Sequence, residues 1–222
     1  MNIVVRKLVL KELYVNRWMM AGASAGAALA ALACAFGKAA FNVGALAWLT
    51  AVIACGAMLA IYGVMNERKE QSLQFVLSLP ISIRQYVLAK TIGLLLCYLV
   101  PWLVAAAAAV ALVLLSPQVP DGFLPYVVLL CGFMLANFAV LLCGALQARS
   151  EGLVTAVIIL TNMAVSVYLF TVGELPGIKA HMWGPAPVWN GAVIAVLLVE
   201  LAVLATALTL PQLTAARRRD FI

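Results

Sequence analysis

Six long runs of apolar residues constrain this chain more than any other feature of its sequence. A helix needs roughly 20 apolar residues to cross the hydrocarbon core of a bilayer. Runs of about that length, without the alternation of barrel strands, occur at Trp18–Phe36, Gly44–Met65, Thr91–Leu115, Phe123–Leu146, Gly152–Val172 and Val188–Leu210. Lipid offers the backbone no hydrogen bonds, so such continuous runs must span as helices. The sequence therefore predicts an all-α, polytopic membrane protein with about six transmembrane helices.

The charge content agrees with a membrane protein and excludes a large soluble domain. Of the 222 residues, 66% are hydrophobic and 10% are charged, whereas a typical soluble domain has about 25% charged residues. So little charge cannot cover a surface that faces water. The six runs also leave no segment long enough for a soluble catalytic domain, so we expect the chain to act in the membrane or with a partner.

Lysine and arginine are distributed unevenly between the two sides of the predicted bundle. One side has Lys38 and Lys179. The other side has Arg6, Lys7, Lys11, Arg17, Arg68, Lys69, Arg84, Lys90, Arg149, Arg217, Arg218 and Arg219. Basic residues concentrate on the cytoplasmic side of membrane proteins, so both termini and the second and fourth loops are predicted to be cytoplasmic. This bias explains the net charge of +6 without a nucleic-acid partner, because no compact basic domain is present.

Cysteine and histidine show no metal-binding pattern. His181 is the one histidine, and no C-x-x-C pair occurs. The five cysteines all lie in apolar runs, at Cys34, Cys55, Cys97, Cys131 and Cys143. We interpret them as small buried hydrophobic residues and expect neither a metal site nor a catalytic group in this chain.

The loop between the second and third spans, residues 66–90, is the longest polar stretch in the chain. Residues 67–79 within it predict a short helix, because Leu73, Val76 and Leu77 share one face at helical spacing. An apolar stripe of this kind can dock in a groove on a soluble partner or rest on the lipid interface. The residues alone leave both interpretations open.

A second helix is predicted to start directly after the first. Pro80 prevents the first helix from continuing smoothly. Ser82 can then cap a new helix, and Gln85 three residues later completes a capping box. Because the new helix runs into the third span, this join could transmit a push from the cytoplasm into the membrane.

This loop resembles the coupling-helix region of the ABC-2 family, the type-2 ABC export permeases. Members have an acidic-basic pair after the second span, a polar-small pair, a leucine-rich turn ending in proline, and a lysine that opens the third span. The matching residues here are Glu67-Arg68, Gln71-Ser72, Leu73, Leu77-Ser78-Leu79-Pro80 and Lys90. The family usually has Gly-Thr in place of Gln71-Ser72, which is a departure from its pattern.

The resemblance also implies a domain organisation. The basic segment 1–17 would be an interfacial elbow helix, and residues 18–222 would form a single six-helix transmembrane domain. Residues 211–222 would be a basic cytoplasmic tail. Family members often have short re-entrant helices before the last span, whereas the glycines and prolines of residues 173–187 are also typical of an ordinary loop.

In function, the resemblance implies the permease subunit of an ABC exporter in the bacterial inner membrane. The chain has no G-x-x-x-x-G-K-[ST] phosphate loop, so ATP and Mg²⁺ would be bound by a separate ATP-binding subunit. A second permease chain, identical or related, would complete the translocation path. The residues expected to couple to the ATPase are Glu67, Arg68, Glu70, Leu73, Val76, Leu77 and Pro80.

Two other functions stay open at this point. The haem-exporting membrane subunit of cytochrome c maturation shares the length, the six spans and a similar loop. Haem handling favours exposed histidines near the outer face, where only His181 is available. A non-transporting membrane scaffold or immunity protein would need no ATPase. A membrane-embedded enzyme fits least, because no group of catalytic residue types gathers at one depth.

Glu200 is the one carboxylate near the middle of a predicted span. A charge at the bilayer centre costs on the order of 3 kcal/mol in insertion assays, so we expect this residue to face the interior or a subunit interface, protonated or hydrogen-bonded. Its role would be a structural hydrogen bond, a substrate contact or a proton relay. Polar candidates for its partners near other span centres are Asn137, Asn162, Thr161 and Ser166.

Overall fold

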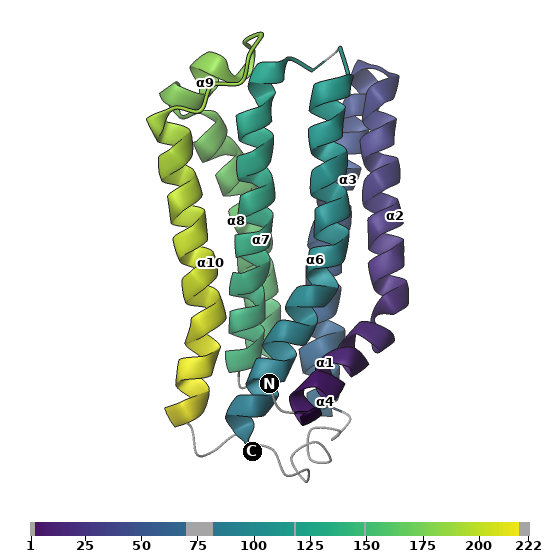
Figure 1. Cartoon of the computed structure of the whole chain (residues 1–222), viewed down its shortest axis with the longest axis vertical. Helices are drawn as coiled ribbons and strands as arrows, with labels where there is room; N and C mark the ends of the chain where they lie inside the picture. Colours follow the sequence, from purple (N-terminus) through teal and green to yellow (C-terminus); the bar gives the residue numbers. More distant parts are fainter. Residues whose placement is uncertain (1–2, 70–81, 118, 149, 218–222) are drawn as a thin grey trace.

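The computed structural model describes residues 3–69, 82–117, 119–148 and 150–217, and among these the regular elements are all helical. Six long helices lie side by side in one bundle (Figure 1). They are α2 (Arg17–Ala33), α3 (Lys38–Ala60), α6 (Ile83–Leu115), α7 (Leu124–Gln147), α8 (Glu151–Gly173) and α10 (Gly191–Arg217). Each is long and apolar enough to cross a membrane. The predicted all-α fold with six spans is therefore confirmed.

The third span begins earlier than its apolar run suggested. We expected it from Thr91, but α6 begins at Ile83, directly after Ser82. The predicted capping box explains this start: the Ser82 hydroxyl accepts a hydrogen bond from the Gln85 amide at 3.3 Å, and the Gln85 side chain accepts one from the Ser82 amide at 3.1 Å. Both orphan amides are thereby satisfied, so the helix starts within the loop between the second and third spans and continues without a break into the third span.

Helix α7 lies at the centre of the bundle. In the most apolar stretch of its span, 61% is buried inside the bundle, against 17–39% for the other five spans. α7 packs against α3, α6, α8 and α10. Phe138 of α7 is 2% exposed, and its ring stacks on Tyr98 of α6 with centroids 3.9 Å apart. Gly56 of α3 allows this ring to approach, since a Cβ there would lie 3.1 Å from the Phe138 ring.

Short elements lie at the two ends of the spans. At one end, the lower end in Figure 1, are α1 (Ile3–Val15) and α4 (Asn66–Lys69), which follows a π-helical turn, η2 (Ile61–Met65). At the other end are the 3₁₀ turn η3 (Asp121–Phe123) and α9 (Pro176–Met182). The loop before the last span, where the resemblance implied a short re-entrant helix, thus contains the short helix α9.

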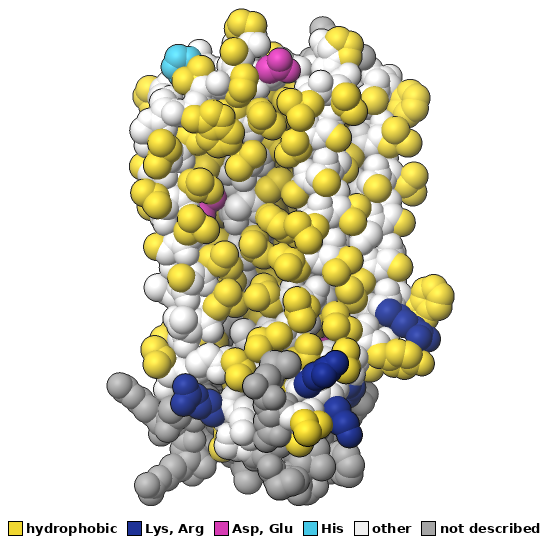
Figure 2. Space-filling view, in the orientation of Figure 1, with side chains coloured by type: hydrophobic (Ala, Val, Ile, Leu, Met, Phe, Trp, Pro, Cys, Tyr) yellow, Lys and Arg dark blue, Asp and Glu magenta, His cyan; other side chains and the backbone are white. Residues whose placement is uncertain are grey.

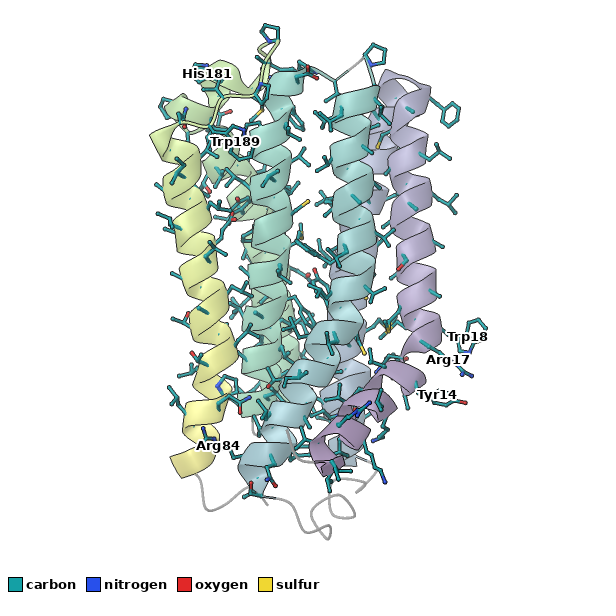
Figure 3. All side chains as sticks on the ribbon, viewed as in Figure 1. Tyr14, Arg17, Trp18, Arg84, His181 and Trp189 are labelled. Carbon is teal, nitrogen blue, oxygen red and sulfur yellow. The ribbon has the colours of Figure 1, made fainter. Side chains whose placement is uncertain are left out.

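The outer surface of the bundle separates apolar from basic side chains. Figure 2 shows hydrophobic side chains over the middle of one face and lysine and arginine at its lower end. Arg17 and Arg84 lie at that end, and His181 and Trp189 lie at the other (Figure 3). The Arg17 guanidinium lies 4.1 Å from the centroid of the exposed Tyr14 ring, an arrangement that suits a membrane interface. The described part of the chain thus has the charge asymmetry of a multi-pass membrane protein.

Candidate functional site

A buried charge cluster joins three elements at the basic end of the bundle. The Lys90 ammonium of α6 lies 2.7 Å from Glu12 Oε1 of α1 and 2.8 Å from Glu67 Oε2 of α4. Lys11 Nζ lies 2.8 Å from Glu67 Oε1, and the Tyr86 hydroxyl donates to Glu67 Oε2 at 3.1 Å. We call Lys11, Glu12, Glu67, Tyr86 and Lys90 the charge cluster. Its two lysines and two glutamates balance each other, and the Lys90 side chain is only 3% exposed.

The close crossing of α1 over α6 brings the charge cluster together. Val5 and Val9 of α1 are buried against Ala89 of α6. One turn further along α6, Gly93 makes room for Glu12, since a Cβ on this glycine would lie 2.9 Å from Glu12 Cγ. Glu12, the one carboxylate of α1, can therefore lie directly against α6 and form an ion pair with Lys90.

Opposing effects set the pKa values of Glu67 and Lys11. Burial alone raises the pKa of Glu67, but the charges of Lys90 and Lys11 and their hydrogen bonds outweigh it, so its pKa is lowered from 4.5. Burial alone lowers the pKa of Lys11, but the hydrogen bond and charge of Glu67, with the charge of Glu12, raise it from 10.5. Both groups are therefore charged at neutral pH.

These shifts predict how the cluster responds to pH. Because the folded-state pKa of Glu67 is lowered, its stabilisation is present above 4.5 and is lost as the pH falls through the lowered value. Because the folded-state pKa of Lys11 is raised, the stabilisation from Lys11 is fully present below pH 10.5 and is lost as the pH rises through the raised value. We expect the melting temperature of Glu67→Gln in detergent to lie below that of the wild type at neutral pH. The difference should shrink below about pH 4, and a difference that stays constant down to about pH 3 would contradict the assignment.

The coupling residues predicted from sequence are only partly within the described chain. Glu67 is a member of the charge cluster, and Arg68 lies in α4. Glu70, Leu73, Val76, Leu77 and Pro80 lie outside the described residues. The role of Glu12 was not predicted from the sequence, although it is the one acidic residue before Glu67. A lone acid in a basic segment is a signal that could have identified it.

A second candidate site lies inside the membrane-spanning part of the bundle, around Glu200 of α10. This residue is 6% exposed, and its Oε1 accepts a hydrogen bond from the Tyr168 hydroxyl of α8. The Tyr168 ring is held in turn by Phe133 of α7, with ring centroids 3.9 Å apart. Glu200 Oε2 is buried and has no hydrogen-bond partner among the described residues. This oxygen lies against Gly132 of α7, and a side chain at that position would collide with it.

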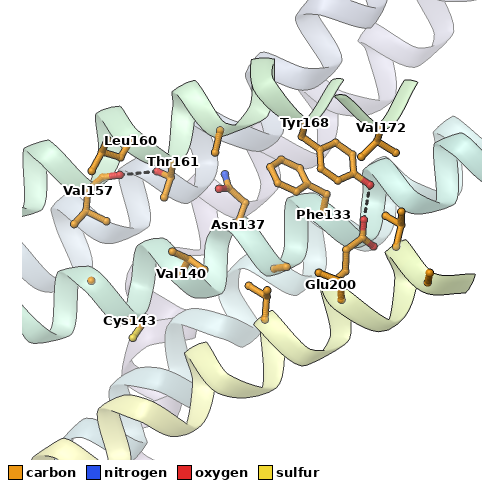
Figure 4. Close-up of a pocket in the computed structure, with 17 residues that line it drawn as sticks. Phe133, Asn137, Val140, Cys143, Val157, Leu160, Thr161, Tyr168, Val172 and Glu200 are labelled. Carbon is orange, nitrogen blue, oxygen red and sulfur yellow. Dashed lines mark hydrogen bonds between the residues drawn. The ribbon is translucent and has the colours of Figure 1, made fainter. Parts of the chain in front are cut away.

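The Glu200 carboxylate borders two cavities. The larger, of about 800 Å³, is a groove between α7, α8 and α10 (Figure 4). The smaller, of about 300 Å³, lies between α6, α7 and α10 and is also lined by Gly132. Most lining side chains of the groove are apolar, and Asn137, Thr161 and Tyr168 add its other polar groups. Thr161 turns its hydroxyl back to the Val157 carbonyl at 2.9 Å, which leaves Asn137 and Glu200 as the polar groups with capacity for a further contact.

The structure brings only some of the predicted partners near Glu200. Asn137 lines the same groove, whereas Asn162 and Ser166 are exposed on the outer side of α8. The buried stripe of α8 runs through Thr161, Val165 and Tyr168. Asn162 and Ser166 each follow a residue of this stripe, about 100° further around the helix, and both are exposed. The partner of Glu200 is thus Tyr168, an aromatic residue that a search for small polar side chains passes over.

Comparison with known proteins agrees with this architecture. The model of a family described as "ABC-2 family transporter protein" matches residues 19–191. No curated protein matches the chain. The matched region covers most of the chain and includes Glu67 and Lys90 of the charge cluster, while Glu200 lies beyond its end. The chain therefore belongs to the ABC-2 family of transporter proteins, as a membrane component of an ABC transporter.

Proposed function

We propose that this chain is the permease subunit of an ABC exporter in the bacterial inner membrane. It would pair with a second permease chain and with a separate ATP-binding subunit, which would bind ATP and Mg²⁺. The observation that carries the proposal is the charge cluster, because it fixes the start of the cytoplasmic loop to α1 and α6. The family membership and the resemblance of the loop to a coupling helix support the same function.

The anchoring of the loop at both ends supports its use as a lever. At its start, Glu67 of α4 is bound to Lys90 of α6. At its end, the capping box of Ser82 and Gln85 fixes the first turn of α6. α6 has 33 residues and is therefore about 50 Å long at 1.5 Å per residue. A force on the loop would reach the whole depth of the bundle through one helix, and could shift the populations of two conformations.

The packing of the bundle supports a second permease chain. α7 occupies the centre of the bundle, where its Leu129, Phe138 and Leu142 are no more than 2% exposed. The centre of one bundle is thus filled with side chains. A translocation path that does not disrupt this core would form between two bundles, and light scattering of the purified complex should give two permease chains.

Co-purification tests the proposed coupling. We expect the tagged full chain, in mild detergent, to bring down a Walker-type ATPase with measurable ATP hydrolysis. A Leu73→Asp/Val76→Asp variant should lose that subunit, because it places charge on the apolar stripe expected to dock. Leu114→Asp/Leu115→Asp is the matched control: both positions are exposed at the opposite end of α6, so the same chemical change there should retain the ATPase.

Two results would count against the proposal. If well-folded wild-type protein brings down no ATPase, a scaffold or immunity protein becomes the better interpretation. If the loop variant keeps the ATPase as well as the control does, then residues 67–79 are not the docking segment. The size of the purified complex would then show separately whether two permease chains are present.

A further inference from the structure

The groove between α7, α8 and α10 contains an acid without a positive partner. Among the described residues that line it, none is lysine, arginine or histidine. Within the described ranges, the Glu200 carboxyl receives one hydrogen bond, from Tyr168, and its buried Oε2 receives none. A buried carboxylate with an unused acceptor is costly, because it has lost water without gaining a replacement. The site thus lacks one specific thing, which is a donor that carries positive charge.

The rest of the groove suits an apolar molecule. Its volume of about 800 Å³ is within the usual range of small-molecule sites, roughly 300–1,000 Å³. α8 and α10 each pack on α7, and the groove between them is bordered by Leu160 and Val199, which are 64% and 62% exposed. Outward-facing side chains of a transmembrane helix face lipid. A molecule dissolved in the bilayer could therefore enter sideways, without passing through water.

We propose that this groove is a lateral binding site for an amphipathic amine, with one protonated amino group and one apolar chain. The ammonium group would bind the Glu200 carboxylate, and the apolar chain would lie along the groove toward Val157 and Cys143 (Figure 4). The terminal torsion of glutamate is broad, so the carboxylate can turn its unused oxygen into the groove. Asn137, which lines the groove on α7, supplies a side-chain carbonyl as a second acceptor.

The positions of Tyr168 and Phe133 support binding at this depth. The Tyr168 hydroxyl holds one Glu200 oxygen, and the stacked Phe133 ring fixes the tyrosine. Tyr168 therefore keeps the carboxylate at this depth, beside the groove, while the second oxygen stays unused. A neutral lipid chain would fill the same space but would leave the acid unpaired, so a cation is the occupant that the whole site favours.

Equilibrium binding in lipid nanodiscs tests the proposal with two matched probes. Radiolabelled dodecylamine carries the charge, and 1-dodecanol has the same chain without it. We expect saturable dodecylamine binding to the wild-type full chain and at least a tenfold loss of affinity in Glu200→Gln. Dodecanol affinity should change less than twofold. Glu174→Gln is the control, because that carboxylate is exposed and lies outside the groove, and it should bind dodecylamine like the wild type.

A second variant keeps the test decisive if Glu200→Gln does not fold. Ala195 lines the groove from an exposed position on α10, so Ala195→Trp fills the groove without replacing a core side chain. It should abolish saturable dodecylamine binding. Equal amine binding by the wild type and Glu200→Gln, or undiminished binding by Ala195→Trp, would overturn the proposal and leave the groove to neutral lipid.

Use of this site for export rests on the proposed function, but binding does not. The assay needs no ATP-binding subunit, so the two proposals can fail independently. Amine binding without a co-purifying ATPase would support the proposed binding site and contradict the proposed exporter function. A co-purifying ATPase without amine binding would support the proposed exporter function and contradict the proposed binding site.

Discussion

Replacing Lys90 with methionine is expected to lower the free energy of unfolding by roughly 3–5 kcal/mol, because it leaves the buried Glu12 carboxylate without its close countercharge. Lys90 Nζ lies 2.7 Å from Glu12 and 2.8 Å from Glu67, and the lysine side chain is only 3% exposed. The loss can be measured by unfolding in mixed detergent–SDS micelles. The effect should be largest near neutral pH, where Glu67 is ionised because its pKa is lowered from 4.5.

Two further variants separate this effect from the loss of any lysine. Lys179 is paired with Glu174 at the opposite end of the bundle, where both side chains are more than half exposed. Lys179→Met should therefore change stability by less than about 1 kcal/mol. Adding Glu12→Gln to Lys90→Met should recover part of the loss, because Glu12 is the acid whose nearest remaining lysine, Lys11, is 4.0 Å away, whereas Glu67 keeps Lys11 at 2.8 Å. Equal stability of Lys90→Met and Lys179→Met would show that the charge cluster is hydrated.

Gly122→Ala is expected to release the cap formed by α9, at the end of the bundle opposite the charge cluster, from the start of α7. The Gly122 amide donates to the Gly184 carbonyl at 3.0 Å. A Cβ at residue 122 would lie 2.7 Å from that same oxygen and would also collide with the His181 carbonyl. Backbone atoms cannot turn aside as a side chain can, so the segment that contains α9 must move. We expect a loss of about 1–3 kcal/mol, as for other overpacked sites.

Hydrogen exchange followed by mass spectrometry would locate the effect of Gly122→Ala. Amides of residues 176–190 should exchange faster in the variant, while those of α3 and α6 keep their wild-type rates. Gly152→Ala is the control, because nothing lies within 4 Å of a Cβ built there. An alanine near the start of α8 should be neutral or slightly stabilising. Unchanged exchange at residues 176–190 would mean that the cap adjusts without opening.

The spans could be predicted from the sequence because each depends only on a local property, the length of an apolar run. The capping box of Ser82 and Gln85 was predictable for the same reason, since both partners lie within one turn. The charge cluster depends instead on how α1 crosses α6. Glu12 and Lys90 are 78 positions apart, and no periodicity in either helix brings them together.

The site at Glu200 shows a second kind of limit. Its burial was predictable, because an acid in a span must avoid lipid. Its partner was not, because the choice among Asn162, Ser166 and Tyr168 depends on which stripe of α8 faces α7. Three polar residues within seven positions point in different directions, and only packing against the neighbouring helices selects one.

Because of the π-helical turn η2, the direction of Glu67 depends on the exact number of residues that precede the coupling loop. Such a turn accommodates one more residue than an α-helical turn, so helix α4 after it is rotated by about 100° relative to an uninterrupted α-helix. Gly63 of this turn lies against Leu94 of α6, where a Cβ would be 2.6 Å from a leucine methyl group. The angular phase of α4 is thereby set, and with it the direction of Glu67. Deleting a single residue from η2 would preserve every apolar run and yet turn the carboxylate away from Lys90.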